Sequence, residues 1–486
     1  LWSRPAKALL ADLGIDIRRF ETAFDRTLYP GLGLSRGVFF TREAFGVDRL
    51  VSGDPLRMVA DDIPADRMNA RGIEAFIADF PLDAVQKARL VALYSERRDV
   101  LAGQSRSRKE ATLASTSYRD FIKKYWGLDD AAANTFQGRS LDFFAVGIDA
   151  LPASDAMDTG YPGFQGLGLT KSAEGQAEMD EPYIHHFPDG NASLARLLVR
   201  KLIPETAAGS TMDDIVTAGF DYAQLDVAGR PTRLRLGATL VAARNGKGAV
   251  DLGYVKDGRL HRVQAGAAVF AGYNMMAPYL MPELPSRQRA ALALSVKAPQ
   301  AYVKVVVRNW RPWVERGVHE VTNPMGFYSR LKLDYPVSLG DYRFPRRPDE
   351  PMVLHLVHVP SLPGAGLDQR NLWRAGRGLL YAATFASFED KVRDELGRMF
   401  GPAGFDAARD IAAITVNRWG HGYAYTANSL HDRETATMPY EVAHRRVGRI
   451  AIANSDAGWS PYAHAAIDEA HRAVGELRPR PAARKS

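Results

Sequence analysis

Residues 233–272 read RLRLGATLVAARNGKGAVDLGYVKDGRLHRVQAGAAVFAG, and this stretch is the most informative about the fold. Apolar and polar residues alternate on both sides of Asn245-Gly246 and lead up to Asp257-Gly258, two dipeptides that favour hairpin turns. The pattern predicts a three-stranded antiparallel meander. Its last strand ends in an apolar run, residues 267–271, that lacks alternation and is therefore predicted to be buried on both faces, as in a parallel sheet.

The segments around this meander mix helical and extended patterns. Helical spacing of apolar residues appears at 1–14, 65–79, 82–100, 118–126, 193–202, 286–294, 379–400 and 462–477. Extended segments are predicted at 15–24, 38–40, 301–307, 352–359, 411–416 and 449–453, and residues 151–192 are rich in turns. The sequence therefore predicts a mixed α/β protein.

Composition excludes several classes of function. The 486 residues carry 63 Lys+Arg and 56 Asp+Glu, a formal charge of +7, with both signs interleaved. We therefore expect no nucleic-acid partner, and the one basic run, in residues 479–486, is predicted to be a disordered tail. No apolar run reaches the ~18 residues that a membrane-spanning helix needs. The chain has no cysteine, which excludes disulfides, thiolate nucleophiles and iron–sulfur clusters.

Two histidine pairs are weak candidates for metal binding. His355 and His358 lie three apart in a Val- and Leu-rich run that reads as a strand, so they are predicted to face opposite sides. His185 and His186 are adjacent and cannot easily hold one ion together. We therefore predict no metal site.

Three segments have the residue types of a ligand site. Residues 186–193 form a predicted turn that opens a helix, whose free N–H groups suit anions and electron-rich ring edges. Residues 419–425 place three aromatic side chains and His421 around two glycines, just past a predicted buried strand. Residues 449–456 form a strand that ends at Asn454-Ser455-Asp456 before a helix, where an acid can bind sugar hydroxyls.

Together these segments resemble the FAD-dependent amine oxidoreductases, the group of monoamine and polyamine oxidases, and most of all the bacterial spermidine dehydrogenases. The resemblance is carried by residues 162–166, 186–193, 268–274, 337–342, 417–425 and 448–456. It implies a flavoprotein with two discontinuous domains. An FAD-binding domain would comprise 1–40, 185–285 and 440–478, and a substrate domain with a mixed sheet and helices would comprise 41–184 and 286–439.

The resemblance also implies roles for individual residues. The substrate cavity would be lined by Trp419, His421, Tyr423 and Tyr425. FAD would contact Asn191, Ala192, Leu240, Val241, Ala271, Gly272, Asn454, Ser455, Asp456 and Ala463. The substrate would contact His186, Asp189 and Asp341, with Asp180 and Glu181 as further candidate carboxylates for a polyamine.

One part of the family pattern is missing from this sequence. The family begins with a strand, a GxGxxG loop and a helix, and no such unit occurs here: the spacing of Gly31, Gly33 and Gly37 differs. Leu1 matches a point downstream of that unit. We therefore expect the sequence to be part of a longer flavoenzyme, whose remainder would carry a twin-arginine export signal to the periplasm; without export the enzyme would be cytoplasmic.

The implied chemistry is hydride transfer from the carbon beside an amine nitrogen to flavin N5. Its partners would be a small-molecule amine and an electron acceptor such as a cytochrome, and haem is a further cofactor of some relatives. Two alternatives stay open. The chain could be another FAD oxidoreductase of this fold, acting on an amino acid or an apolar substrate, or a non-catalytic protein that binds amines.

Overall fold

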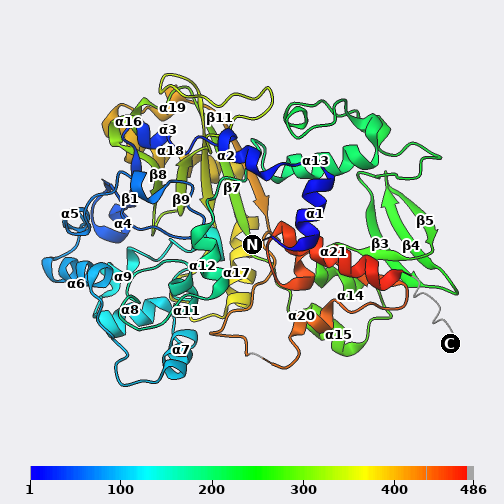
Figure 1. Cartoon of the computed structure of the whole chain (residues 1–486), viewed down its shortest axis with the longest axis horizontal. Coiled ribbons are helices and arrows are strands. Elements are labelled where there is room, and N and C mark those ends of the chain that lie inside the picture. Colours follow the sequence, from blue (N-terminus) through cyan, green and yellow to red (C-terminus); the bar gives the residue numbers. More distant parts are fainter. Residues whose placement is uncertain (1, 434, 479–486) are drawn as a thin grey trace.

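The computed structural model of the chain describes residues 2–433 and 435–478, so the tail that was predicted to be disordered, 479–486, lies outside the described residues. Within these ranges, every helix is too short or too polar to span a bilayer. Helices combine with three sheets, which agrees with the predicted α/β class. The seven-stranded sheet occupies one end of the molecule and a three-stranded sheet the other (Figure 1).

The larger sheet has the strand order β11-β7-β10-β9-β8-β1-β2. Its strands are β1 (Ser35–Phe40), β2 (Arg49–Ser52), β7 (Gln300–Val307), β8 (Val318–Thr322), β9 (Arg330–Leu333), β10 (Met352–His358) and β11 (Ile411–Trp419). Of the strand pairs that the described residues form in this sheet, β1–β8 alone is parallel. The mixed sheet that the resemblance implied is therefore present.

Alternation along the strands gives this sheet two different faces. In β7, Val303 and Val305 join an apolar core, whereas Tyr302 and Lys304 point to the opposite face. The apolar face is covered by α17 (Gln369–Ala382) and α18 (Phe385–Phe400), which supply Leu380 and other core residues. The opposite face carries polar side chains, and it belongs to the candidate site described below.

A layer of short helices packs beside the sheet around a second core. They are α5 (Ile73–Ala78), α6 (Ala84–Ser95), α7 (Arg106–Ala114), α8 (Tyr118–Trp126), α9 (Asp130–Asn134), α10 (Leu141–Phe144), α11 (Ala153–Asp158) and α12 (Ala173–Asp180). The aromatic rings of Phe121, Phe136 and Tyr118 are buried there. Helix α8 shows how the sequence sets its bounds, since Ser117 caps its start and Gly127, at φ +72°, ends it.

The other end of the molecule holds the meander (Figure 1), and a small parallel sheet includes the strand that follows the meander in the chain. The meander consists of β3 (Thr239–Asn245), β4 (Val250–Lys256) and β5 (Arg259–Ala265), and the parallel pair consists of β6 (Ala268–Phe270) and β12 (Ile450–Ile452). The helices packed near them are α13 (Asn191–Leu202), α14 (Ala277–Leu280), α15 (Ser286–Leu292), α20 (Pro439–Ala443) and α21 (Ala463–Leu477). Asp257 and Gly258 have φ of +51° and +73°, as a type I′ hairpin turn requires. The predicted meander is confirmed.

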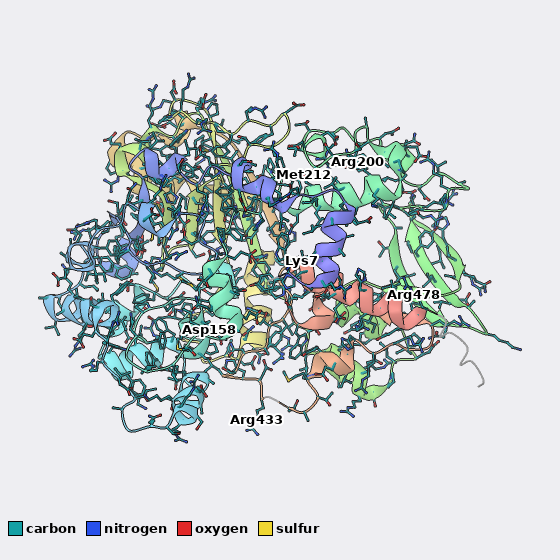
Figure 2. The ribbon with its side chains drawn as sticks, viewed as in Figure 1. Lys7, Asp158, Arg200, Met212, Arg433 and Arg478 are labelled. Atoms are coloured by element: carbon teal, nitrogen blue, oxygen red, sulfur yellow. The ribbon has the colours of Figure 1, made fainter. Side chains whose placement is uncertain are left out.

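The remaining helices are short, except for the first. They are α1 (Arg4–Asp12), α2 (Phe20–Ala23), α3 (Leu28–Gly31), α4 (Arg42–Phe45), α16 (Arg311–Arg316) and α19 (Ala407–Asp410). Helix α1 lies beside α21, where Ser3 donates a hydrogen bond of 2.6 Å to Asp468 (Figure 1). Arg200, on α13, donates to the carbonyl oxygen of Thr211 and so ties this helix to the loop that carries Met212 (Figure 2).

Three expectations about the elements were wrong. Residues 15–24 are helical rather than extended, because the Asp16 carboxylate caps a short 3₁₀ turn that leads into α2. Residues 379–400 lie in two helices, because Thr384 caps a new start at α18. The strand β6 is not buried on both faces: Phe270 packs in an apolar cluster, whereas Val269 is 41% exposed.

Candidate functional site

Two polar residues stand at the carboxyl ends of the parallel strands β6 and β12. Phe270 pairs with Ile452, and the residues four positions further along, Asn274 and Asp456, meet each other. The backbone N–H of Asn274 donates to Asp456 Oδ2 at 3.1 Å, and both residues are fully buried. Ligands of open α/β sheets bind at this end of parallel strands.

A lysine neutralises the buried carboxylate. Lys297 Nζ lies 2.6 Å from Asp456 Oδ1, and the two side chains are 14% and 1% exposed. Asn454, at φ +90°, turns the chain after β12 and accepts a hydrogen bond from the Asp456 N–H. The turn therefore holds a carboxylate and an ammonium together in a site that excludes most water. We call Asn274, Lys297 and Asp456 the polar junction.

The polar junction is tied to the aromatic segment 419–423. Arg377, on α17, donates to the carbonyl oxygen of Lys297 at 2.8 Å and to that of Gly420 at 2.6 Å. The rings of Tyr273 and His421 lie 4.6 Å apart. Burial and the neighbouring charges of Arg377 and Lys297 lower the pKa of His421, so this imidazole is neutral. The end of β12 and the segment after β11 therefore form one site.

Close packing explains one of the glycines in this segment. A Cβ on Gly422 would lie 2.9 Å from the carbonyl oxygen of Ala298. That backbone atom cannot move aside easily, because Ala298 exchanges two hydrogen bonds with Gly422 and Tyr423. The glycine thus brings the aromatic segment into direct contact with the residues that lead into β7.

Tyr302 and Tyr423 form a pair on the polar face of the seven-stranded sheet. Their hydroxyl oxygens are 2.6 Å apart, and the ring of Tyr302 contacts Trp419 at 5.3 Å and His355 at 4.8 Å between ring centroids. Burial raises the pKa of both phenols, so they stay neutral and can donate or accept hydrogen bonds.

Charged side chains form a row across this face beside the tyrosine pair. Strand register aligns Lys304, His355, Lys332, Glu320 and Arg36 on neighbouring strands. Lys332 Nζ lies 3.7 Å from Asp62 and 3.8 Å from Glu320, and Arg36 pairs with Asp61. Burial, and then the charges of Lys304 and Lys332, lower the pKa of His355. The carboxylates of this row are therefore already paired with cations, and the imidazole between the two lysines is neutral.

The structure brings together only part of the predicted site. His421 contacts Tyr273 beside the polar junction, and Trp419 and Tyr423 contact Tyr302. The Asn454 side chain donates to the carbonyl oxygen of Gly272, which follows Ala271, and Ser455 and Asp456 lie in the turn after Asn454. Ala463 is the first residue of α21. Leu240 and Val241 lie in β3 of the meander, where Val241 is 43% exposed. Tyr425 lies in the core, with its hydroxyl 2.6 Å from Asp432 and its ring against Trp373 and Trp459.

The predicted residues at the start of α13 lie away from the polar junction, whereas His186 lies beside the charged row, because the centroid of the Tyr335 ring on which it stacks is 3.5 Å from Lys332 Nζ. Asn191 and Ala192 begin that helix, which packs in a separate apolar cluster. Asp189 accepts a hydrogen bond from the Ser193 hydroxyl and pairs with Arg196, so in this structure its partners are side chains of α13. His186 stacks on Tyr335 at 4.3 Å, and Asp341 is exposed. Asp180 accepts hydrogen bonds from Gln176, and Glu181 lies 3.7 Å from His185.

The histidines that were considered for a metal occupy separate environments. His358 stacks on Phe327 at 3.8 Å, whereas His355 faces Tyr302 from the same strand. The prediction that this segment is a strand is confirmed. Within the described ranges, no three His, Asp or Glu side chains form a group that could hold a metal ion.

Sequence reasoning missed Asn274, Lys297, Arg377 and Tyr302 as site residues. The alternation of Tyr302 and Lys304 with valines was a usable signal, because it places both side chains on the face opposite the core. Lys297 and Arg377 had no such signal, since their roles depend on which segments meet in space.

One hollow on the described part of the chain lies apart from this site. It has a volume of about 620 Å³ and lies between residues 21–28, 64–67 and 336–346, none of which belongs to the polar junction or the tyrosine pair. Asp25 and Arg346 form an ion pair at its edge. The hollow therefore adds nothing to the chemistry of the candidate site.

Comparison with known proteins identifies the fold. No model of a protein family matches the chain, and no curated protein matches it. Two solved mutants of putrescine oxidase, made to redesign its cofactor binding, match 98% of this chain and 86% of their own, with 13% and 15% identity and TM-scores of 0.50. Cyclohexylamine oxidase from Brevibacterium oxydans matches 93% of this chain and 83% of its own, with 15% identity and a TM-score of 0.46. The chain thus has the α/β fold seen in putrescine oxidase.

Proposed function

We propose that the protein is an FAD-dependent oxidoreductase that oxidises an amine. The observation that carries the proposal is the link from Asp456 through Lys297 and Arg377 to the aromatic segment 419–423. It puts groups suited to a dinucleotide beside groups suited to an amine. The likeness of fold to putrescine oxidase supports the same proposal.

The residues of the polar junction fit a flavin dinucleotide. A buried carboxylate such as Asp456 accepts hydrogen bonds from sugar-type hydroxyls, and the Lys297 ammonium suits phosphate oxygens. The side-chain amide of Asn274 is buried and has no hydrogen-bond partner on either atom. Both atoms thus keep hydrogen-bonding capacity that the described residues do not use, as is expected where a polar cofactor supplies the partners.

FAD, when bound, supplies the electron sink that takes a hydride from the carbon beside the amine nitrogen. The chain's own residues would bind and orient the substrate. Trp419 offers an apolar wall and a face for a cation, and the neutral Tyr302–Tyr423 pair offers oxygen acceptors for an amine N–H.

A spermidine-type polyamine is the narrower form of the proposal. A polyamine needs a carboxylate for its distant ammonium group, and the acids nearest the tyrosine pair already have cationic partners: Asp142 and Glu320 pair with Arg330, and Asp334 pairs with Lys304. A second ammonium would have to compete with these cations. The rival substrate classes, an amino acid or an apolar substrate, have no second ammonium group and do not face this competition.

Further parts of the proposal rest on the resemblance alone. They are the division into an FAD-binding and a substrate domain at the boundaries given above, an external electron acceptor such as a cytochrome, and a periplasmic location. The proposal covers FAD as its cofactor and does not extend to haem, which no observation on the described residues supports.

The deciding experiment mixes purified protein with FAD, removes free flavin and records the flavin absorbance without oxygen. Bleaching of bound flavin by spermidine supports the narrow proposal, and bleaching by a simple monoamine supports the general one. Bleaching by amino acids alone favours the rival oxidoreductase. A colourless protein that still binds amines would show that the chain is a non-catalytic binding protein.

A further inference from the structure

Asn274 has a side chain whose polar atoms are buried without partners. The residue has no exposed surface, and neither Oδ1 nor Nδ2 has a hydrogen-bond partner, although its backbone N–H donates to Asp456. Buried amides are normally paired, as Gln288 and Asn428 show, since each donates to a backbone carbonyl. Asn274 therefore keeps a polar group in a place where it does not help the chain to fold.

The position of this amide points to one half of the cofactor. Tyr273, the preceding residue, contacts His421 in the aromatic segment, so Asn274 lies between that segment and Asp456. The reacting ring of a bound flavin belongs next to the substrate, and the ring is joined to a chain of hydroxyl groups. A carboxamide presents one acceptor and two donors, the complement of such hydroxyls and of the ring's imide edge.

We infer that the Asn274 carboxamide binds the flavin ring and its attached polyol, rather than the ADP part. This inference rests on the proposed function, because it assigns a residue to the same cofactor site. The unpaired amide is then a binding group that is satisfied only when the ligand is present, at a cost to the stability of the free protein.

The test compares two alanine variants by calorimetry, with FAD, riboflavin and ADP as separate probes. Asn323 is the matched control, because both of its side-chain amide atoms are also buried without partners, but it lies in the turn between β8 and β9. Asn274→Ala is expected to lower the affinities for FAD and riboflavin about tenfold, as the loss of one hydrogen bond predicts. The affinity for ADP should stay unchanged. Asn323→Ala should leave all three affinities unchanged.

Thermal unfolding without ligand completes the test. Neither variant is expected to have a lower Tm than the wild type, because no hydrogen bond is lost in either. A fall in Tm for Asn274→Ala but not for Asn323→Ala would assign the amide a structural role and overturn the inference; Asn274→Ser, which keeps a small polar group, gives the affinities if the alanine variant does not fold.

The measured affinities distinguish the inference about Asn274 from the proposed function. Equal FAD affinity in the wild type and Asn274→Ala overturns the inference and leaves the proposed function standing, since a buried water would then satisfy the amide. If Asn274→Ala lowered the affinity for ADP but not for riboflavin, the inference would also be overturned. A wild-type protein that binds none of the flavins overturns the proposed function as well.

Discussion

Lys297 Nζ lies 2.6 Å from Asp456 Oδ1, and this ion pair joins a residue just before β7 to the turn after β12. Both charges are largely removed from water, so each depends on the other. Lys297→Met should therefore lower the free energy of unfolding by about 3 kcal/mol, because it leaves the buried carboxylate with N–H groups alone. Urea denaturation measures this value.

Two further variants make the test specific. Lys247→Met, at an exposed lysine of the β3–β4 turn, should change stability by less than about 0.5 kcal/mol. Adding Asp456→Asn to Lys297→Met should recover part of the lost stability, since the unpaired charge is gone. No recovery in the double variant would mean that packing of the lysine stem, rather than the ion pair, stabilises this turn.

The hydrogen bond between Tyr302 and Tyr423 has a predicted effect on catalysis. Tyr423→Phe removes one of two hydroxyl groups offered to the amine, so kcat/KM should fall about tenfold, while the free energy of unfolding falls by about 1 kcal/mol or less. Tyr118→Phe is the control, because that buried hydroxyl donates to Pro162 away from the site. This control variant should lose a similar amount of stability and keep its kcat/KM unchanged. If kcat/KM were the same in both variants, the Tyr423 hydroxyl would not contribute to the substrate site.

Glu395 gives the fold a dependence on pH. Its carboxylate accepts the N–H groups of Phe327 at 2.7 Å and Tyr328 at 3.3 Å, and burial raises its pKa to about 7 from an ordinary value of 4.5. Because the folded-state pKa lies above the unfolded one, the stability contributed by protonated Glu395 is complete below about pH 4.5 and is lost as the pH rises through 7.

The rise of the pKa from 4.5 to about 7 corresponds to roughly 3 kcal/mol of stability that is lost between low and high pH. Glu395→Gln cannot ionise, so its urea midpoint should fall less than that of the wild type between pH 5 and pH 8. Glu389→Gln, at a partly exposed glutamate of the same helix α18 that pairs with Arg393, should behave like the wild type. Parallel pH profiles for Glu395→Gln and the wild type would contradict the assignment.

The elements that the sequence predicted best are those with strong local signals. The Asp257-Gly258 turn and the end of α8 at Gly127 both need positive φ, and the Asp-Gly dipeptide and the glycine at these positions indicate it in the sequence. The site was predicted only in part. The segments around Asp456 and Trp419 have recognisable patterns, but the polar junction depends on Lys297 and Arg377, which reach it through contacts between segments far apart in the sequence.

Thr384 shows why a periodic pattern can hide a helix boundary. Apolar spacing continues from α17 into α18, so residues 379–400 read as one helix, yet the Thr384 hydroxyl accepts the Ser387 N–H and starts a new helix. Thr384→Ala should lower the free energy of unfolding by about 1 kcal/mol. An equal loss in Thr384→Ala and Thr384→Ser would show that the hydroxyl is not the stabilising group.

Arg377 is predicted to position the aromatic segment relative to the cofactor site. Its guanidinium donates to the carbonyl oxygens of Lys297 and Gly420, and the single ammonium of a lysine cannot reproduce this two-pronged contact. Arg377→Lys should therefore leave FAD affinity within about threefold and raise the KM for the amine about tenfold, because the polar junction stays intact while Trp419 and Tyr423 shift. Arg374→Lys, one turn earlier on the exposed side of α17, is the matched control and should change neither value. If Arg377→Lys impaired the binding of FAD and of the amine equally, the arginine would instead support the whole site. A specific role in positioning the aromatic segment relative to the polar junction would then be ruled out.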